Sequence, residues 1–483
     1  MLCSLAGSFP SRVRMSVQNP PRLLDLAGKS LLSDEASAIC ALEDLPTELF
    51  PALFMEAVHG NHVKTLKAMV PAWPFVRLPL GGLMQVLHVG ALQAVLEGLD
   101  VLLTQKVHPR RCKLQVLDLR NTSQDFWSMW SGSRAPLCSG SMTAPTVEDR
   151  SRTEQSLTPL QVFIELCLSE TTLDGILPYL MSWAEERKGL IHLCCKKLNI
   201  VSMPLESIIN VLSMVQLDCI QEVQVNCTWH LSTLAMFSLL LGHMSNVRRL
   251  LFSSTHAFVH EAQEQQQVVQ ITSQFLRLHH LQDLYMESPS FLEGCLDQML
   301  RCLSTPLENL AISHCLLTES DLTHLSRCPS ISQLKGLDLS GVTMTDFSPD
   351  VLQGLLEKVT ATLQELDLEL CGITESQLEA ILPVLSRCWE LTSFSLRGNL
   401  LSMAKVLGCT TGLPSLCQEF YPPPRESYSS RGALHPGRLA QVRAELLEIL
   451  RALGRPRIIW ISSSPCPYYG DDTFGHAERI FIP

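Results

Sequence analysis

Leucines and other apolar residues recur along most of the chain in a pattern that alternates between a short strand and a helix. Residues 363–373 read LxxLxLxxCxI, and the same frame returns at residues 307–317. In the LxxLxL part, every second side chain points to one face, as it does in a β-strand. The stretch that follows, such as residues 376–385, has apolar residues at helical spacing. The pattern therefore predicts repeated strand–helix units.

Eight copies of this frame align between residues 190 and 401, and an isolated copy lies at residues 114–119. The copies begin at residues 190, 220, 247, 281, 307, 334, 363 and 391. A period of this length is typical of leucine-rich repeats whose units contain a helix. One unit cannot bury its apolar face alone, so stacked units must supply the core. We therefore expect an α/β leucine-rich-repeat solenoid, a horseshoe with parallel strands on its concave face.

The remaining sequence suggests how the chain is divided around this array. The expected parts are a flexible extension over 1–21, a helical module over 22–110, a first repeat strand with a Ser/Thr/Pro-rich loop over 111–160, the repeats over 161–420, and a cap with a tail over 421–483. The helical module should begin with two short amphipathic helices, at 23–32 and 34–42. Translation could start at Met1 or at Met15. A helix over 438–453 would cover the open end of the core.

Composition and charge exclude several classes of function. Hydrophobic residues make up 46% of the chain and charged residues 18%, so most of it can bury a core. The net charge of −11 argues against a nucleic-acid-binding surface, which needs a dense Lys/Arg footprint. No apolar run reaches the roughly 18 residues of a membrane helix. We expect neither nucleic acid nor membrane as a partner, and a cytoplasmic or nuclear location.

The sequence lacks the motifs that signal catalysis or metal binding. Its 18 cysteines include no CxxC pair, and no HExxH, GxSxG or Gly-rich phosphate loop occurs. Several cysteines occupy apolar repeat positions, where a free thiol behaves as a small hydrophobic group. We therefore expect a protein that is not an enzyme and has no cofactor and no metal site.

The repeat pattern instead predicts a binding surface on the concave face. The outward side chains of consecutive strands form a ladder there. In this ladder a basic rung, Arg248 and Arg249, is followed by a mostly acidic stretch with one aromatic residue, Tyr285. Such a face could select a protein partner with a basic segment, with Tyr285 as the best anchor by residue type, or it could be solvated strand surface. The candidate residues are Arg248, Arg249, Asp283, Tyr285, Glu287, Asp338, Asp367 and Arg397.

The helical module contains a short motif of another kind. Residues 45–50 read LPTELF, and an apolar helix and Trp73 follow. This order resembles an F-box, the helical adaptor-binding element of ubiquitin-ligase receptors. Proline is tolerated in the first helical turn, where its missing N–H is not needed. The same residues could instead only cap the end of the repeat array. The candidate adaptor-binding residues are Leu45, Pro46, Leu49, Phe50 and Leu53.

Residues 352–356 read LQGLL, which matches LxxLL, a helical motif that docks on nuclear receptors. The motif lies in a repeat helix whose leucines should face the core. The sequence therefore favours a structural role, and exposure of these leucines decides between the two interpretations.

From Met15 onward the chain resembles the PRAME family of leucine-rich-repeat proteins. The resemblance is carried by residues 31–36, 45–50, 66–75, 114–120, 194–198 and 466–467. It implies a substrate receptor of a cullin-2-type ubiquitin ligase, whose N-terminal helices bind Elongin B/C and cullin-2 and whose repeats bind an unknown protein substrate. It also implies repression of retinoic-acid-receptor transcription, differentiation and apoptosis, and promotion of proliferation, with a nuclear receptor as a further candidate partner.

One departure from the family pattern bears on metal binding. Relatives of this type often carry a CPxCG tail, whereas residues 466–470 read CPYYG here, so we expect no zinc site. Two other functions stay open. The protein could be a scaffold or transcriptional co-regulator that uses no ligase, or, by fold analogy alone, an inhibitor of another enzyme.

Overall fold

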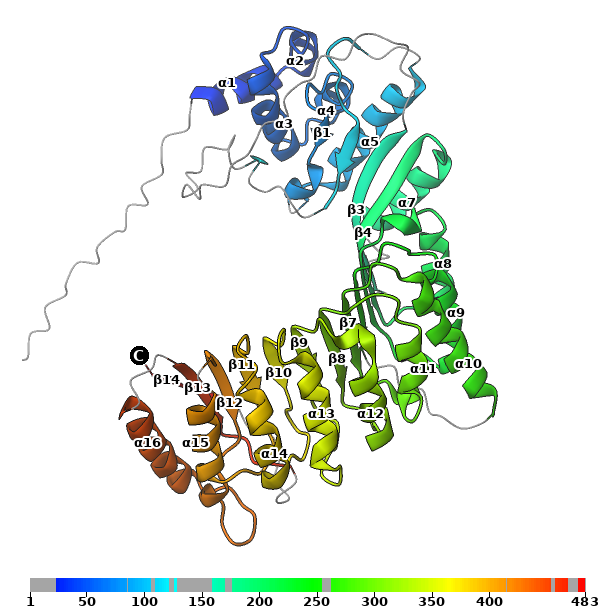
Figure 1. Ribbon diagram of the computed structural model, residues 1–483. Helices are drawn as coiled ribbons and strands as arrows, with labels where there is room; N and C mark the ends of the chain where they lie inside the picture. Colours follow the sequence, from blue (N-terminus) through cyan, green and yellow to red (C-terminus); the bar gives the residue numbers. More distant parts are fainter. Residues whose placement is uncertain are drawn as a thin grey trace, which may run out of the picture. The chain divides into compact units, whose positions relative to one another are not determined.

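The computed structural model (Figure 1) describes residues 23–84, 86–105, 109–120, 126–127, 159–169, 176–253, 262–413, 415–452, 457–467 and 477–482. The chain forms two compact units, Met1–Gln161 and Val162–Pro483. The expected extension over 1–21 and most of the expected loop over 121–158 lie outside the described residues. Among the residues described, no helix has the length and apolar character needed to cross a membrane.

The first unit consists mainly of helices. They are α1 (Leu23–Leu32), α2 (Glu35–Ala41), α3 (Phe50–His59), α4 (Val63–Met69) and α5 (Val89–Thr104), with the parallel strand pair β1 (Arg77–Leu78) and β2 (Val116–Asp118). The two predicted N-terminal helices are confirmed, and the Asp34 carboxylate caps α2 by accepting from the Ala36 amide. The core contains a fully buried Trp73, whose ring meets Phe50 and Phe54 edge-on.

In the second unit, strands and helices alternate along the chain. The elements are β3 (Leu160–Leu168), α7 (Ile176–Glu186), β4 (Ile191–Val201), α8 (Leu205–Leu212), β5 (Glu222–Asn226), α9 (Leu231–Leu241), β6 (Arg249–Ser253), α10 (Ala262–Ser273), β7 (Asp283–Glu287), α11 (Leu296–Arg301), β8 (Asn309–Ser313), α12 (Glu319–Arg327), β9 (Gly336–Asp338), α13 (Pro349–Val359), β10 (Glu365–Asp367), α14 (Glu375–Leu385), β11 (Ser393–Ser395), α15 (Met403–Gly412), β12 (Gln418–Tyr421), α16 (Pro436–Ala452), β13 (Arg457–Ser462) and β14 (Ala477–Ile482). From β3 onward the strands follow one another through the sheet in chain order.

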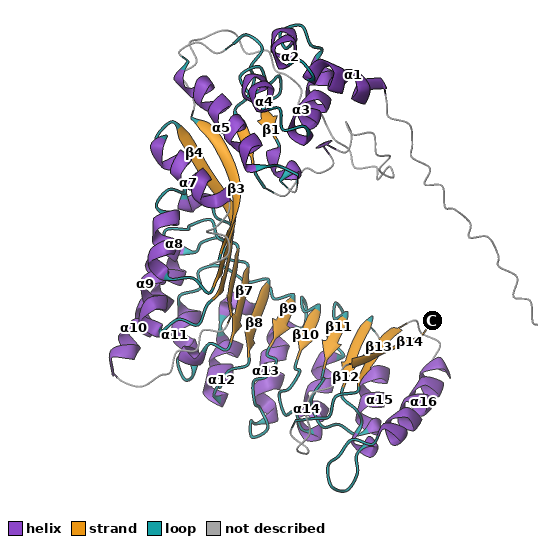
Figure 2. Cartoon of the chain, turned by 180° about the vertical axis from the view of Figure 1, so that it is seen from behind, coloured by secondary structure: helices purple, strands orange, loops and turns teal. Residues whose placement is uncertain are grey.

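This arrangement is an α/β leucine-rich-repeat fold. The pairings from β4 to β13 are parallel, and β13 pairs with β14 in the antiparallel sense. Figure 2 shows the repeat helices gathered on one side of the strands, and none of the repeat helices that the structure describes lies on the opposite side of the sheet. We call this side of β4 to β13 the strand face.

The register of the sheet explains why the leucine frame recurs. Inward residues of neighbouring strands lie side by side and are almost fully buried, as in the row Val223, Leu250, Leu284, Leu310, Leu337, Leu366 and Phe394. In two repeats the Cys or Asn after the strand satisfies a backbone carbonyl of the preceding repeat. The Cys371 thiol donates to the Leu339 carbonyl at 3.1 Å, and the Asn399 amide donates to the Leu368 carbonyl at 2.9 Å.

One expectation about the array was wrong. The copy assigned to residue 190 is out of register, because Leu198 and Ile200 of β4, not Leu193 and Cys195, align with Val223 and Val225 of β5. After residue 420 the parallel sheet continues with β13, which pairs with β12. The predicted helix over 438–453 forms as part of α16 as far as Ala452, and residue 453 lies outside the described residues.

Candidate functional site

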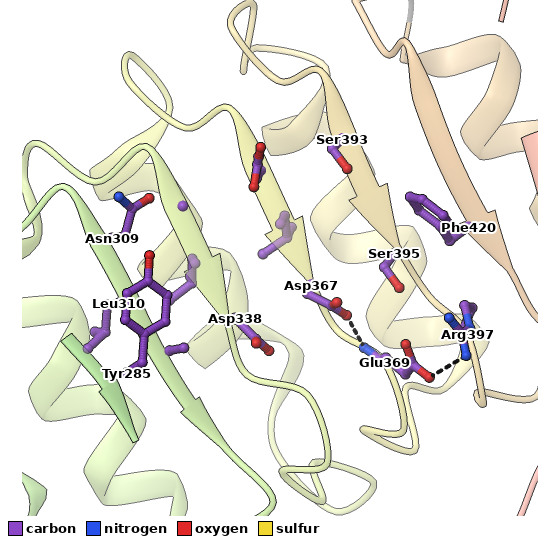
Figure 3. A pocket seen from close by; sticks show the side chains of 15 residues that line it. Tyr285, Asn309, Leu310, Asp338, Asp367, Glu369, Ser393, Ser395, Arg397 and Phe420 are labelled. Atoms are coloured by element: carbon purple, nitrogen blue, oxygen red, sulfur yellow. Dashed lines mark hydrogen bonds and ion pairs between the residues drawn. The ribbon is translucent and has the colours of Figure 1, made fainter. Parts of the chain in front are cut away.

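The strand face contains a hollow of about 320 Å³ that extends from β7 to β12 (Figure 3). We call this feature the acidic hollow. Its polar and aromatic lining consists of Tyr285, Asn309, Asp338, Glu365, Asp367, Glu369, Ser393, Ser395, Arg397 and Phe420. Small residues open the floor, because Ala311 and Gly336 stand where neighbouring strands carry larger side chains. A Cβ at Gly336 would lie 2.5 Å from the Asn309 side-chain oxygen, so a larger residue here would displace the Asn309 side chain.

Two aspartates at the centre of the hollow are held in the same way. Asp338 and Asp367 occupy equivalent positions of β9 and β10 and are direct neighbours in the parallel register. Each carboxylate accepts a 2.8 Å hydrogen bond from a backbone amide two residues further on, that of Ser340 or Glu369. Adjacent strands lie about 4.8 Å apart, so this local turn places two carboxylates close together and fixes their orientation.

The surroundings of Asp367 change the acidity of its carboxyl group. Burial, together with repulsion from the negative charges of Asp338 and Glu369, raises the pKa of the Asp367 carboxyl to about 6, although the Glu369 amide acts in the opposite direction. Asp367 is therefore mostly ionised at neutral pH and close to half-protonated near pH 6. A cation placed in the hollow would relieve the repulsion and favour the ionised form.

One end of the hollow is partly neutralised from within. Arg397, which follows β11, forms a 3.1 Å ion pair with Glu369. Beyond it, the Phe420 ring stacks on Trp460 of β13, with ring centroids 5.8 Å apart. At the other end, the Tyr285 ring lies under the Arg249 guanidinium, 5.9 Å from the ring centroid. The hollow is thus acidic at its centre and aromatic at both ends.

The structure brings together four of the eight strand-face candidates: Tyr285, Asp338, Asp367 and Arg397. Arg249 and Asp283 lie just outside and form a 3.2 Å ion pair with each other. Arg248 and Glu287 are exposed and do not line the hollow. The expected basic rung is thus partly neutralised across the sheet, which moves the centre of the site toward β9 and β10.

Sequence reasoning missed Phe420 as a site residue. The β12 segment lacks alternating leucines because Glu419 occupies the inward position, next to Phe394 of β11. This glutamate is fully buried and accepts hydrogen bonds from the hydroxyls of Thr410, at 3.0 Å, and Tyr421, at 2.7 Å. The repeat period was the available signal, since β12 follows β11 at an offset of 25 residues, with Leu416 in the position of Leu391.

In the first unit, three of the five candidate adaptor-binding residues line one small groove. Leu45, Leu49 and Leu53 form the apolar wall of a cavity of about 100 Å³ between α1 and the start of α3. Leu45 and Leu49 are half-buried and Pro46 is exposed, whereas Phe50 and Leu53 lie in the core. The last two residues therefore support the groove rather than form an open face.

Arg111 holds the segment that carries this groove. Its guanidinium donates to the Leu42 carbonyl at 2.8 Å and also to the carbonyls of Glu43 and Leu45. The same guanidinium lies 5.1 Å from the centroid of the Phe50 ring. The loop between α2 and α3 is thus fixed by one cation from the distant segment before β2.

Two other sequence features, the LxxLL motif and Cys466, are buried in the protein. Leu352, Leu355 and Leu356 of α13 are buried, so the LxxLL sequence contributes to the repeat core and is not exposed. Cys466 is also buried, and its thiol donates to the Gly398 carbonyl at 3.1 Å.

Comparisons with known proteins match nearly the whole chain. The family profile described as the PRAME N-terminal domain matches residues 20–127, and the PRAME C-terminal domain matches residues 160–480. Human PRAME family member 8 is 54% identical over 461 residues, which cover 94% of this chain and 97% of that protein. Human PRAME family member 12 is 53% identical over 467 residues, with 94% and 95% covered.

Among solved structures, the leucine-rich-repeat-containing protein LegL7 from Legionella pneumophila is 14% identical and covers 59% of this chain and 89% of its own. The TM-score of 0.33 is too low for this likeness to bear on function.

Proposed function

This chain belongs to the PRAME family, and we propose that it is the substrate-recognition subunit of a cullin-2-type ubiquitin ligase. In this proposal the repeats bind a protein substrate, and the N-terminal helices bind Elongin B/C and cullin-2. The protein itself carries out no catalysis. The family resemblance extends the proposal to cytoplasmic or nuclear action, to repression of retinoic-acid-receptor transcription, differentiation and apoptosis, and to promotion of proliferation.

The observation that carries the proposal is the acidic hollow on a sheet face that no repeat helix covers. A receptor needs a fixed surface with charge and aromatic anchors, and Tyr285 and Phe420 at the ends of the hollow have the residue types that dominate binding energy at interfaces. The strands hold these residues in a rigid register, which lowers the ordering cost of binding.

The groove in the first unit supports the adaptor half of the proposal. Leu49 is half-buried beside Leu45, and α1 exposes Leu23 and Leu26, with exposed fractions of 85% and 49%. An apolar groove next to exposed leucines is the kind of surface onto which an amphipathic helix of another protein packs. The adaptor proteins named by the family resemblance are the partners to test.

The test is co-purification of the full chain with Elongin B/C and cullin-2, beside two variants. Leu49→Asp places a charge at the groove, and Val101→Asp places the same charge on α5, where Val101 is 36% exposed. We expect the complex to form with the unaltered chain and with Val101→Asp, and to be lost with Leu49→Asp while circular dichroism shows that the fold is kept.

Absence of the complex with the unaltered chain would contradict the ligase role. The alternative of a scaffold or co-regulator would then explain the binding face better. An equal loss with both variants would contradict the assignment of the adaptor site to the groove.

A further inference from the structure

We propose that the acidic hollow binds the guanidinium group of an arginine in a protein segment, with the guanidinium lying between Asp338 and Asp367. This inference deepens the proposed receptor role by naming the chemistry of the segment that the repeats recognise. It rests on three independent features of the hollow, which are its uncompensated charge, its geometry and its size.

The first feature is negative charge that the protein does not balance. Asp338, Glu365 and Asp367 line the hollow, and their carboxylates have no ion-pair partner among the described residues. The nearby cations are already engaged with other carboxylates, since Arg249 pairs with Asp283, Lys335 with Glu308, and Arg397 with Glu369. A cation bound in the hollow would therefore balance the negative charge of these carboxylates.

The second feature is the geometry of the hydrogen-bonding groups that line the hollow. The backbone amides of Ser340 and Glu369 each occupy one oxygen of Asp338 or Asp367, which leaves the second oxygen for a ligand. The Ser395 hydroxyl is 7% exposed, lines the same space and interacts with the Asp367 carboxyl, whose pKa it lowers. Fixed acceptors on adjacent strands suit a donor with several N–H groups in a plane.

This geometry favours arginine over lysine. A guanidinium presents five N–H donors in a rigid fork that matches carboxylates and also stacks on aromatic faces. Phe420 and Tyr285 supply rings at the two ends of the hollow, as Figure 3 shows. A lysine ammonium could meet the charge but would use neither the planar array of acceptors nor ring stacking to the same extent.

The third feature is size. A volume of about 320 Å³ lies at the lower end of the roughly 300–1,000 Å³ of small-ligand sites. The hollow therefore has room for one long side chain with some neighbouring backbone, and the rest of a bound segment would lie along the exposed strands. A peptide segment is thus a better match for this site than a convex folded surface.

The experiment titrates the full chain with the peptide acetyl-GSGRGSG-amide and follows binding by saturation-transfer NMR. Matched peptides replace arginine by citrulline, which has the same shape without the charge, or by lysine. We expect weak binding of the arginine peptide at pH 7.5, affinity about tenfold lower for citrulline, and affinity several-fold lower for lysine.

Variants place the binding on the hollow. Asp338→Asn/Asp367→Asn keeps the acceptors for the two backbone amides and removes both charges, and we expect at least a tenfold loss of affinity. Glu222→Gln is the matched control, because Glu222 is a carboxylate on the strand face outside the hollow, paired with Lys197 at 3.1 Å. It should leave affinity unchanged, and thermal melting should show that both variants fold.

The proposal is overturned if citrulline or lysine binds as well as arginine, or if the double variant binds as well as the unaltered chain. The double variant should still co-purify with Elongin B/C and cullin-2. For the unaltered chain, absence of the adaptor complex with peptide binding intact would refute the ligase role alone. For the same unaltered chain, absence of peptide binding with the adaptor complex intact would refute only the arginine site.

Discussion

The two halves of the strand face use charge in opposite ways. From β4 to β7 the outward charges pair across neighbouring strands, Lys197 with Glu222 and Arg249 with Asp283. Asp283 also accepts a hydrogen bond from the side-chain amide of Asn309. From β9 to β10 this row holds Gly336 and Glu365, and the outward row two residues further along brings two aspartates side by side. Both halves share the same backbone register and the same inward leucines. The difference shows that the repeat frame fixes the fold, whereas the outward residues decide where the sheet can bind.

The largest expected effect concerns the row of buried inward leucines, which both halves of the strand face share. Leu250→Ala and Leu366→Ala each remove a side chain from the inward row, where both leucines are at most 2% exposed. Each should lower the free energy of unfolding by about 2–5 kcal/mol, as measured by urea denaturation of the full chain. A much smaller loss at Leu366 than at Leu250 would mean that the acidic half is not packed as an equal part of the array.

The next effect is the pH dependence of peptide binding, which distinguishes the half that contains Asp367. The pKa of Asp367 is raised to about 6 by burial and by the neighbouring acids Asp338 and Glu369. Glu365 on the same strand and Arg397 after β11 are the other charged groups that line this space. Because a cation needs the ionised form of Asp367, affinity for the arginine peptide should fall about tenfold between pH 7.5 and pH 5.

Titrations at several pH values check this prediction. Asp367→Asn should bind weakly at every pH and lose most of the pH dependence. A peptide affinity that stays constant from pH 7.5 to pH 5 would contradict the assignment of Asp367 to the binding site.

Removal of the Asp367 charge should weaken peptide binding but stabilise the folded protein. A carboxyl whose pKa is higher in the folded than in the unfolded chain destabilises the fold when ionised and is less unfavourable when protonated. Asp367→Asn should therefore raise the free energy of unfolding by about 1 kcal/mol at pH 7.5, and this advantage should shrink as the pH falls through 6 toward 5. Urea denaturation at the two pH values measures it. A lower stability of the variant at pH 7.5 would show that repulsion does not dominate at this site.

The smallest effect concerns the paired half. Glu222→Gln breaks an ion pair in which Lys197 and Glu222 have exposed side-chain fractions of 48% and 27%. Solvent-exposed pairs contribute about 0–1 kcal/mol, so the change in the free energy of unfolding should be within about 0.5 kcal/mol. A loss above 1 kcal/mol would mean that these cross-strand pairs hold the sheet together rather than only neutralise it.

The sequence predicted those parts of the fold in which local pattern and tertiary packing agree. Alternating leucines located β5 to β11, because each inward side chain is buried by the same residue type in the next repeat. The prediction failed where packing uses other chemistry. At β12 a buried Glu419, satisfied by Thr410 and Tyr421, replaces the inward leucine. At β4 the apolar residues extend over a long strand, so the sequence alone does not show which of them align with β5.

The candidate site could be predicted only in part. Residue type and strand alternation singled out Tyr285, Asp338, Asp367 and Arg397. They could not show that Arg249 is bound to Asp283, because that pairing depends on the register between β6 and β7. For the helical module, the LPTELF motif predicted a helix with Pro46 in its first turn, whereas Thr47–Leu49 form a separate 3-10 turn and α3 begins only at Phe50. Which of its residues face solvent depended on Trp73 and Arg111, whose packing buries Phe50.

The measurement that tests the central claim most directly is a crystal structure of the full chain with acetyl-GSGRGSG-amide at pH 7.5. The account predicts the arginine side chain in the acidic hollow, with its guanidinium hydrogen-bonded to both Asp338 and Asp367. A peptide bound over β4 to β7, or bound at the hollow with its arginine turned to solvent, would contradict it.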